Sequence, residues 1–154
     1  MGKHLLEVKN LKKTYPLRGT SNKLFAPKEH MIAVNDMSFY IEEGEIYGLV
    51  GESGCGKSTT GRAIVGLNKM DSGEILYNGK DLCRLNEREF RPLRKDLQMV
   101  FQDTLSALNP RGRIGDILEE TLIIHGMGDA AKRRETVLEI LQKVGLSEEH
   151  YFRY

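Results

Sequence analysis

Tryptophan is absent from this 154-residue sequence, and cysteine occurs twice, at Cys55 and Cys83. The two cysteines show no metal-like spacing, so the sequence predicts neither a disulfide framework nor a zinc site, and it favours a reducing compartment. The net charge of +1 creates no global field that would attract nucleic acid. No apolar run reaches the roughly 18 residues of a membrane span, so we expect no membrane-spanning segment.

What the sequence does contain is one sharply defined segment, residues 51–58, which reads Gly-Glu-Ser-Gly-Cys-Gly-Lys-Ser. It fits the phosphate-binding pattern G-x-x-x-x-G-K-[ST] without a mismatch. Glycines let such a loop curl until successive N–H groups point at an anion. Lys57 would then add a positive charge at the β- and γ-phosphates of a nucleotide, and the Ser58 hydroxyl would join the shell of a Mg²⁺ ion. The segment predicts nucleotide binding, with a chance match in a glycine-rich surface turn as the alternative.

The residues on either side of this segment have the pattern that a phosphate loop requires. Residues 45–50 form a short apolar run without proline, which is typical of a parallel strand covered on both faces. Residues 57–67 carry several apolar side chains and predict a helix. The N-terminus of that helix would turn its partial positive charge toward the phosphates.

The segments before and after this unit predict further strands. Alternating apolar residues predict strands over residues 4–15 and 31–41, and residues 16–30 between them read as a loop or insertion. Residues 74–77 predict another strand. The Asn78-Gly79 pair that follows is a strong signal for a two-residue hairpin.

Beyond the hairpin, Asn86 is placed to cap a short helix that ends before Arg94. The basic residues of this stretch alternate with acidic ones, so we interpret it as a solvated helix face rather than a nucleic-acid patch. Residues 97–101 predict a second buried strand.

The last third of the sequence predicts helices. Apolar residues recur at helical spacing over residues 114–122 and 137–144. Gly126 and Gly128 interrupt the helical pattern between these two apolar stripes, and Gly145 is placed to end the second helix. The chain is therefore expected to be α/β, with a β-rich start and an all-helical end.

These motifs resemble the ATPases of ABC transporters, and more narrowly the oligopeptide/dipeptide importer branch, which includes nickel importers. The resemblance rests on Gly51 to Thr59, followed by Met99-Val100-Phe101-Gln102-Asp103 and by Ser106-Ala107-Leu108-Asn109-Pro110-Arg111. It implies a P-loop NTPase core of the ABC type with an antiparallel β-subdomain over residues 1–102, with a loop insertion near residues 17–30. Residues 103–154 would form part of an α-helical subdomain.

The resemblance also implies roles for individual residues. Tyr15 matches the aromatic residue that stacks on adenine, although a tyrosine packed on the insertion at a strand end is the alternative. Lys57 and Gln102 match residues that act in catalysis, Ser58 and Gln102 would hold Mg²⁺, and Thr59 would place a hydroxyl near the α-phosphate. With ATP and Mg²⁺ as cofactors, the implied nucleotide site comprises Tyr15, Gly51, Glu52, Ser53, Gly54, Cys55, Gly56, Lys57, Ser58 and Thr59.

The function that the resemblance implies is that of an ATP-binding, ATP-hydrolysing importer subunit, with peptides favoured over nickel as cargo. Its partners would be transmembrane permease subunits and a second ATP-binding subunit, identical or paralogous, with no nucleic acid involved. Its place would be cytoplasmic, peripheral on the inner face of the cell membrane. The alternatives are a non-transport ABC ATPase or another P-loop enzyme, such as a kinase or a GTPase. The Asn-Lys-x-Asp motif of GTPases does not occur in the sequence.

Three elements of the family pattern do not occur before Tyr154: the LSGGQ-type signature, the Walker B strand ending in Asp-Glu, and the switch histidine. We therefore expect a truncated, N-terminal portion of a longer protein that binds nucleotide but does not turn it over. In the family the Walker B strand lies in the same sheet as the strand expected at residues 45–50. We also expect an unpaired apolar edge and self-association.

Overall fold

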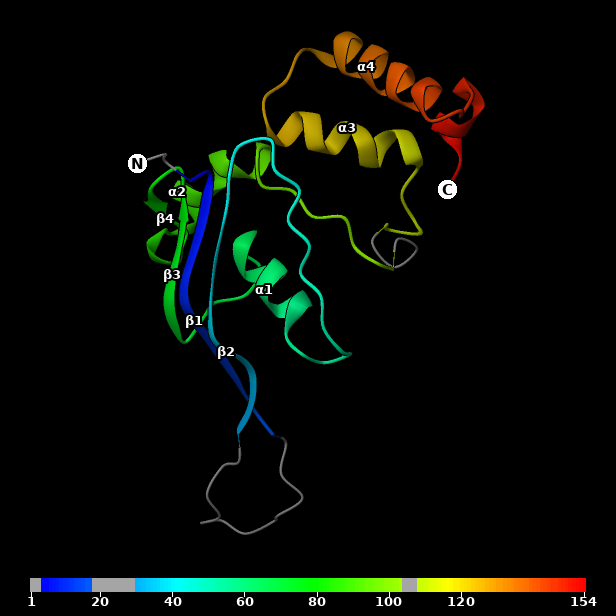
Figure 1. Ribbon diagram of the computed structural model, residues 1–154. Helices are drawn as coiled ribbons and strands as arrows, with labels where there is room; N and C mark the ends of the chain where they lie inside the picture. The colour runs from blue at the N-terminus through cyan, green and yellow to red at the C-terminus, as the bar shows by residue number, and fades with distance from the viewer. Residues whose placement is uncertain (1–3, 18–29, 104–107) are drawn as a thin grey trace, which may run out of the picture. The chain divides into compact units, whose positions relative to one another are not determined.

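The computed structural model describes residues 4–17, 30–103 and 108–154, so the insertion expected near residues 17–30 lies almost wholly outside the described residues. The chain divides into two compact units, Met1–Met99 and Val100–Tyr154. Figure 1 shows the elements of each unit in chain order. Among the described residues, no helix has the length and apolar character that crossing a membrane requires.

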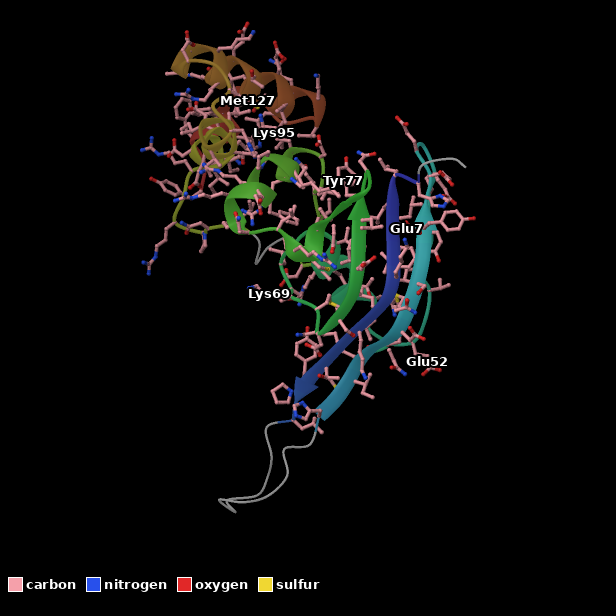
Figure 2. The ribbon with its side chains drawn as sticks, turned by 90° about the vertical axis from the view of Figure 1, so that its left-hand side faces the viewer. Glu7, Glu52, Lys69, Tyr77, Lys95 and Met127 are labelled. Carbon is pink, nitrogen blue, oxygen red and sulfur yellow. The ribbon has the colours of Figure 1, made fainter. Side chains whose placement is uncertain are left out.

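The first unit is built on an antiparallel sheet of four strands in the order β2-β1-β3-β4. The strands are β1 (Leu6–Pro16), β2 (His30–Ile41), β3 (Ser72–Tyr77) and β4 (Lys80–Asp81). Figure 2 shows Glu7 on the central strand β1 and Tyr77 on its neighbour β3. The strands predicted from alternating apolar residues in the first unit are confirmed, apart from small shifts at their ends.

The β3–β4 connection is the predicted hairpin. Asn78 and Gly79 have φ angles of 51° and 80°. Positive φ at both central residues defines the type I′ turn, whose twist matches that of the flanking strands. The Asn-Gly pair therefore forms the hairpin as predicted, because both residues readily adopt positive φ.

Strand β1 changes its register at Asn10, which has a φ of 45°. The backbone N–H of Asn10 donates to Ser38 Oγ at 2.8 Å, and its Nδ2 donates to Asp36 Oδ1 at 2.8 Å. Such a register shift is typical of a β-bulge, in which one extra residue in a strand changes the direction of the residues that follow. Leu11, the next residue, is fully buried in the core of the unit, with Val8 and Ile75.

Helix α1 (Lys57–Ile64) packs on this core through Thr60 and Ala63. It is three residues shorter than the predicted helix over residues 57–67, because Gly66 takes a φ of 73° and turns the chain. A Cβ at Gly66 would lie 2.6 Å from the Phe90 ring, so the close packing of Phe90 also requires glycine there.

Helix α2 (Glu87–Phe90) begins immediately after Asn86, as predicted. The Asn86 side chain accepts from the N–H groups of Arg88 and Glu89, and Glu89 closes a capping box. One of the basic residues here, Arg94, pairs locally and forms a two-bond contact with Glu87, at 2.5 and 3.0 Å. This pairing agrees with the interpretation of a solvated face.

The buried strands predicted at residues 45–50 and 97–101 are wrong for this structure. Neither segment enters the sheet that the described residues form. The side chains of Ile46, Val50 and Val100 are 98%, 91% and 90% exposed. A strand depends on hydrogen bonds to a neighbouring strand, and the described residues place none beside these segments, so apolar composition alone does not form one.

The second unit contains α3 (Ile114–Ile124) and α4 (Ala130–Lys143), which confirms the two predicted helical stripes. Its core consists of Val137, Leu141 and Tyr151. Gly126 and Gly128, both with a φ of 65°, lie between the helices, as the sequence indicated.

Candidate functional site

The loop over residues 51–56 leads directly into α1. Its residues are exposed up to Cys55, and Gly56 is buried. Gly56 has a φ of 93°, and a Cβ there would lie 2.1 Å from the carbonyl oxygen of Ala33 on β2. Residue 56 must therefore be a glycine, because its backbone is left-handed and because β2 approaches it closely.

The first turn of α1 presents backbone N–H groups without acceptors from the described part of the protein. No described side chain caps the helix, and no acidic residue lies in its first turn. Counting from the start of the helix, Thr60 is the first residue whose N–H has an acceptor among the described residues. It donates to Gly56 O at 2.9 Å. The N–H groups of Lys57, Ser58 and Thr59 are thus left for an external anion, at the positive end of the helix dipole.

Lys57 places its ammonium inside the curl of the loop. The Nζ donates to the carbonyl oxygens of Gly51 and Glu52, at 2.6 Å each, and lies 3.4 Å from Cys55 Sγ. The residues that the sequence predicted for a phosphate site are therefore brought together here. A single cation beside free N–H groups is a chemical environment suited to phosphate oxygens.

The hydroxyl residues that follow Lys57 differ in exposure. Ser58 is exposed, and Thr59 is half-buried. Among the described residues, no cluster of three or more His, Cys, Asp or Glu side chains could hold a metal. A metal at Ser58 would therefore have to take most of its ligands from a phosphate group and water, which is how Mg²⁺ is commonly held.

Tyr15 lies near the end of β1, opposite Met31 of β2. Its hydroxyl accepts a hydrogen bond from Asn68 Nδ2 at 3.3 Å, and Lys13 Nζ lies 5.4 Å from its ring centroid. Because Asn68 follows α1, this bond directs the ring toward the α1 side of the sheet. The packing of Tyr15 on the insertion, the alternative interpretation, concerns residues outside the described ranges.

Gln102 belongs to the second unit, where its side chain is exposed. The first unit alone therefore assembles Lys57, Ser58 and Thr59 with the loop, without Gln102. Within the second motif of the resemblance, Ser106 and Ala107 lie outside the described residues.

The structure adds one group that sequence reasoning missed. Asp71, in the turn before β3, accepts hydrogen bonds from Lys13 Nζ (2.9 Å), Thr14 N (2.6 Å) and Thr14 Oγ1 (2.7 Å). These bonds, led by that from Lys13, lower the pKa of Asp71 to about 2. No local pattern signals a contact between residues so far apart in the sequence.

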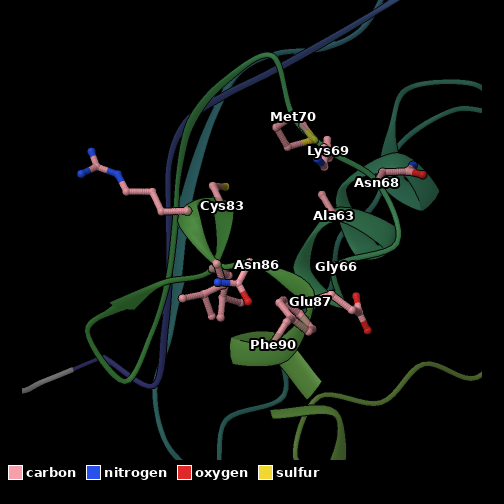
Figure 3. Close-up of a pocket in the computed structure, with 12 residues that line it drawn as sticks. Ala63, Gly66, Asn68, Lys69, Met70, Cys83, Asn86, Glu87 and Phe90 are labelled. Atoms are coloured by element: carbon pink, nitrogen blue, oxygen red, sulfur yellow. The ribbon is translucent and has the colours of Figure 1, made fainter. Parts of the chain in front are cut away.

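A cavity of about 580 Å³ lies at the other end of α1, between that helix and the segment that contains α2. Figure 3 shows Ala63 and Gly66 on the α1 side of it, and Cys83, Asn86 and Phe90 on the side of the segment that contains α2. None of the residues predicted for the phosphate site lines this cavity. It is a feature separate from the loop.

The ABC transporter family model matches residues 34–154. The dipeptide transport ATP-binding protein DppF of Escherichia coli is 41% identical over 97% of this chain and 44% of its own length. The oligopeptide transport ATP-binding protein OppF of Haemophilus influenzae is 45% identical over 92% of this chain and 43% of its own length. The chain thus spans less than half the length of these curated relatives.

Solved structures show the same fold. A bacterial ABC transporter cassette, determined as a dimer, superposes with a TM-score of 0.77 at 27% identity, covering 96% of this chain and 60% of the cassette. A second structure of that cassette, in a post-hydrolysis state with ADP and Pi, also gives a TM-score of 0.77, at 28% identity and with the same coverage. On the family match, the two relatives and the shared fold, this chain belongs to the ABC transporter family of ATP-binding proteins, with a partial α/β P-loop fold of the ABC type.

Proposed function

We propose that the first unit binds the triphosphate of ATP on the loop formed by residues 51–58. The observation that carries the proposal is the Lys57 ammonium inside the loop, next to the free N–H groups at the start of α1. An incoming phosphate would replace the carbonyl oxygens of Gly51 and Glu52 as the acceptor for Lys57. That exchange replaces a bond from the ammonium to a neutral carbonyl with a bond in which both partners are charged.

Around the phosphates, each remaining site residue has its own proposed role. Ser58 would offer its hydroxyl to Mg²⁺, and Thr59 would place its hydroxyl near the α-phosphate. Tyr15 would stack on the adenine, since a flat aromatic face contributes about 1–3 kcal/mol against a base. Gln102 is proposed, from the resemblance alone, to contact the metal or the attacking water. When bound, Mg²⁺ would neutralise charge on the phosphates.

We further propose that the whole protein hydrolyses ATP to drive import. The relatives at 41% and 45% identity are named as dipeptide and oligopeptide transport ATP-binding proteins, and another, at 41% identity, as a glutathione import ATP-binding protein. Peptides are therefore the proposed cargo class. The proposed partners are transmembrane permease subunits and a second ATP-binding subunit, on the cytoplasmic face of the membrane.

The test is a titration of the 154-residue chain with a fluorescent ATP analogue in the presence and absence of Mg²⁺. Binding should be saturable, sensitive to Mg²⁺ and lost in Lys57→Ala. The matched control is Lys80→Ala, which removes an exposed lysine from β4, at the opposite edge of the sheet from β2, and should leave the affinity unchanged. Circular dichroism establishes that both variants are folded.

Two outcomes would overturn the proposal: no binding by the folded wild-type chain, or equal binding by wild type and Lys57→Ala. A phosphate-release assay on the same samples addresses turnover. We expect no release from the 154-residue chain alone, and robust Lys57-dependent hydrolysis would contradict that expectation.

A further inference from the structure

The turn between α1 and β3 is bonded to the end of β1 through one carboxylate. Asp71 accepts from the side chain of Lys13 and from both the backbone N–H and the hydroxyl of Thr14, at 2.6–2.9 Å. Its own N–H donates to Lys12 O at 3.0 Å. Four hydrogen bonds therefore fix this stretch of β1 to a turn that is more than fifty residues away in the sequence.

The residue immediately after this anchored stretch is Tyr15. Its hydroxyl accepts from Asn68, three residues before Asp71, and the Lys13 ammonium that Asp71 binds lies 5.4 Å from its ring centroid. The Lys13 side chain is 17% exposed, so most of it packs against the protein, and its ammonium is bonded to Asp71 at 2.9 Å. The same short turn thus contacts the Tyr15 ring at its hydroxyl and, through Lys13, at the ring itself.

We infer that Asp71 is a positioning residue for Tyr15, holding Lys13 and Thr14 so that the ring is set in place before a nucleotide base stacks on it. The inference rests on the proposed function, because it assigns Asp71 a role in base binding by the same site. Fixing a side chain in its bound orientation lowers the entropy lost on binding. Asp71 acts on the base and not on the phosphates, which contact the loop at Lys57.

The experiment compares ATP with inorganic tripolyphosphate, which has the phosphates but no base. For Asp71→Ala we expect ATP affinity to fall about fivefold, a part of the stacking contribution, while tripolyphosphate affinity is unchanged. Thr14→Val removes one hydroxyl donor to Asp71 and should give a smaller loss with the same selectivity. It also keeps the test valid if Asp71→Ala does not fold.

The matched control is Asp81→Ala. Asp81 also accepts a backbone N–H, from Cys83 at 3.0 Å, and pairs with an arginine, Arg84 at 2.9 Å, but it lies on β4. This variant should bind both ligands as wild type does. In a Tyr15→Ala background, Asp71→Ala should produce no further loss of ATP affinity, because the two changes act through one ring.

The outcomes separate the two proposals. If the wild-type chain binds neither ligand, the proposed function fails, and this inference fails with it. If the wild-type chain binds both ligands but Asp71→Ala weakens both equally, or weakens neither, the positioning role is overturned while the phosphate site stands. Additive losses in the double variant would likewise overturn it.

Discussion

Lys57 Nζ and the carbonyl oxygen of Gly51 lie 2.6 Å apart, so the cation of the loop is bonded to the first residue of the same loop. The loop is therefore already curled in the structure, with its charge at the centre. An entering anion has to replace the backbone carbonyl oxygens as the acceptor for Lys57, but the loop does not have to change from an extended to a curled conformation. Preformed geometry of this kind keeps the ordering cost of binding low.

Gly56→Ala should destabilise the first unit by about 2 kcal/mol or more, because it combines a strained backbone with a steric clash. The φ of 93° disfavours any Cβ, and that Cβ would lie 2.1 Å from Ala33 O. The measurement is the free energy of unfolding in urea. Gly54→Ala is the matched control: its φ is 83° but nothing lies within 4 Å of the added Cβ, so only backbone strain of about 1 kcal/mol is expected. Equal losses in the two variants would contradict the contact with β2.

Stability should fall in acid partly through Asp71. Its pKa is lowered from 3.8 to about 2 by the bonds from Lys13 and Thr14. A carboxyl group whose pKa is lower in the folded than in the unfolded state stabilises the fold above pH 4, and this stabilisation disappears as the pH falls toward 2. Urea midpoints measured between pH 5 and pH 2 should therefore decline more steeply for wild type than for Asp71→Asn. Parallel curves would show that the interaction does not persist in solution.

Tyr151 should be among the last of the six tyrosines to ionise. Its hydroxyl donates to Glu119, and this bond raises the phenol pKa above its usual value of 10, with burial as a second cause. A spectrophotometric titration of tyrosinate absorbance should lose its latest component in Glu119→Gln. Because the pKa is raised in the folded state, the stabilisation is complete below pH 10 and is lost as the pH rises above it. An unchanged titration curve in Glu119→Gln would rule out the assignment.

The 154-residue chain should associate with itself through its exposed apolar segments. Ile46 is 98% exposed and Val50 is 91% exposed, and large apolar surfaces left in water promote association. Sedimentation should show concentration-dependent oligomers that decrease in Ile46→Lys and in Val50→Lys. Val144→Lys, which changes a 66% exposed valine in the second unit, is the control and should leave association unchanged. A monomer at all concentrations would contradict the prediction.

Local signals in the sequence were enough for the turns and caps. Asn78-Gly79 formed the hairpin and Asn86 formed the cap of α2, because each depends on backbone preferences within a few residues. The phosphate loop was also found from its own residues, since the spacing of Gly51, Gly56 and Lys57 describes one continuous curl. The adenine-stacking role of Tyr15 and the role of Gln102 came from the resemblance and stay predictions.

By itself, then, the sequence determined the helices, the hairpin, the loop that contains Lys57, and the strands whose apolar residues alternate. Tertiary structure alone decided which distant segments meet. The hydrogen bond between Asp71 and Thr14 and the close approach of Gly56 to Ala33 both depend on it. Residues 45–50 lie outside the sheet despite their apolar composition. The physical reason is that a local preference acts through neighbours along the chain, whereas a strand or a long-range hydrogen bond requires a partner that only the folded backbone brings within reach.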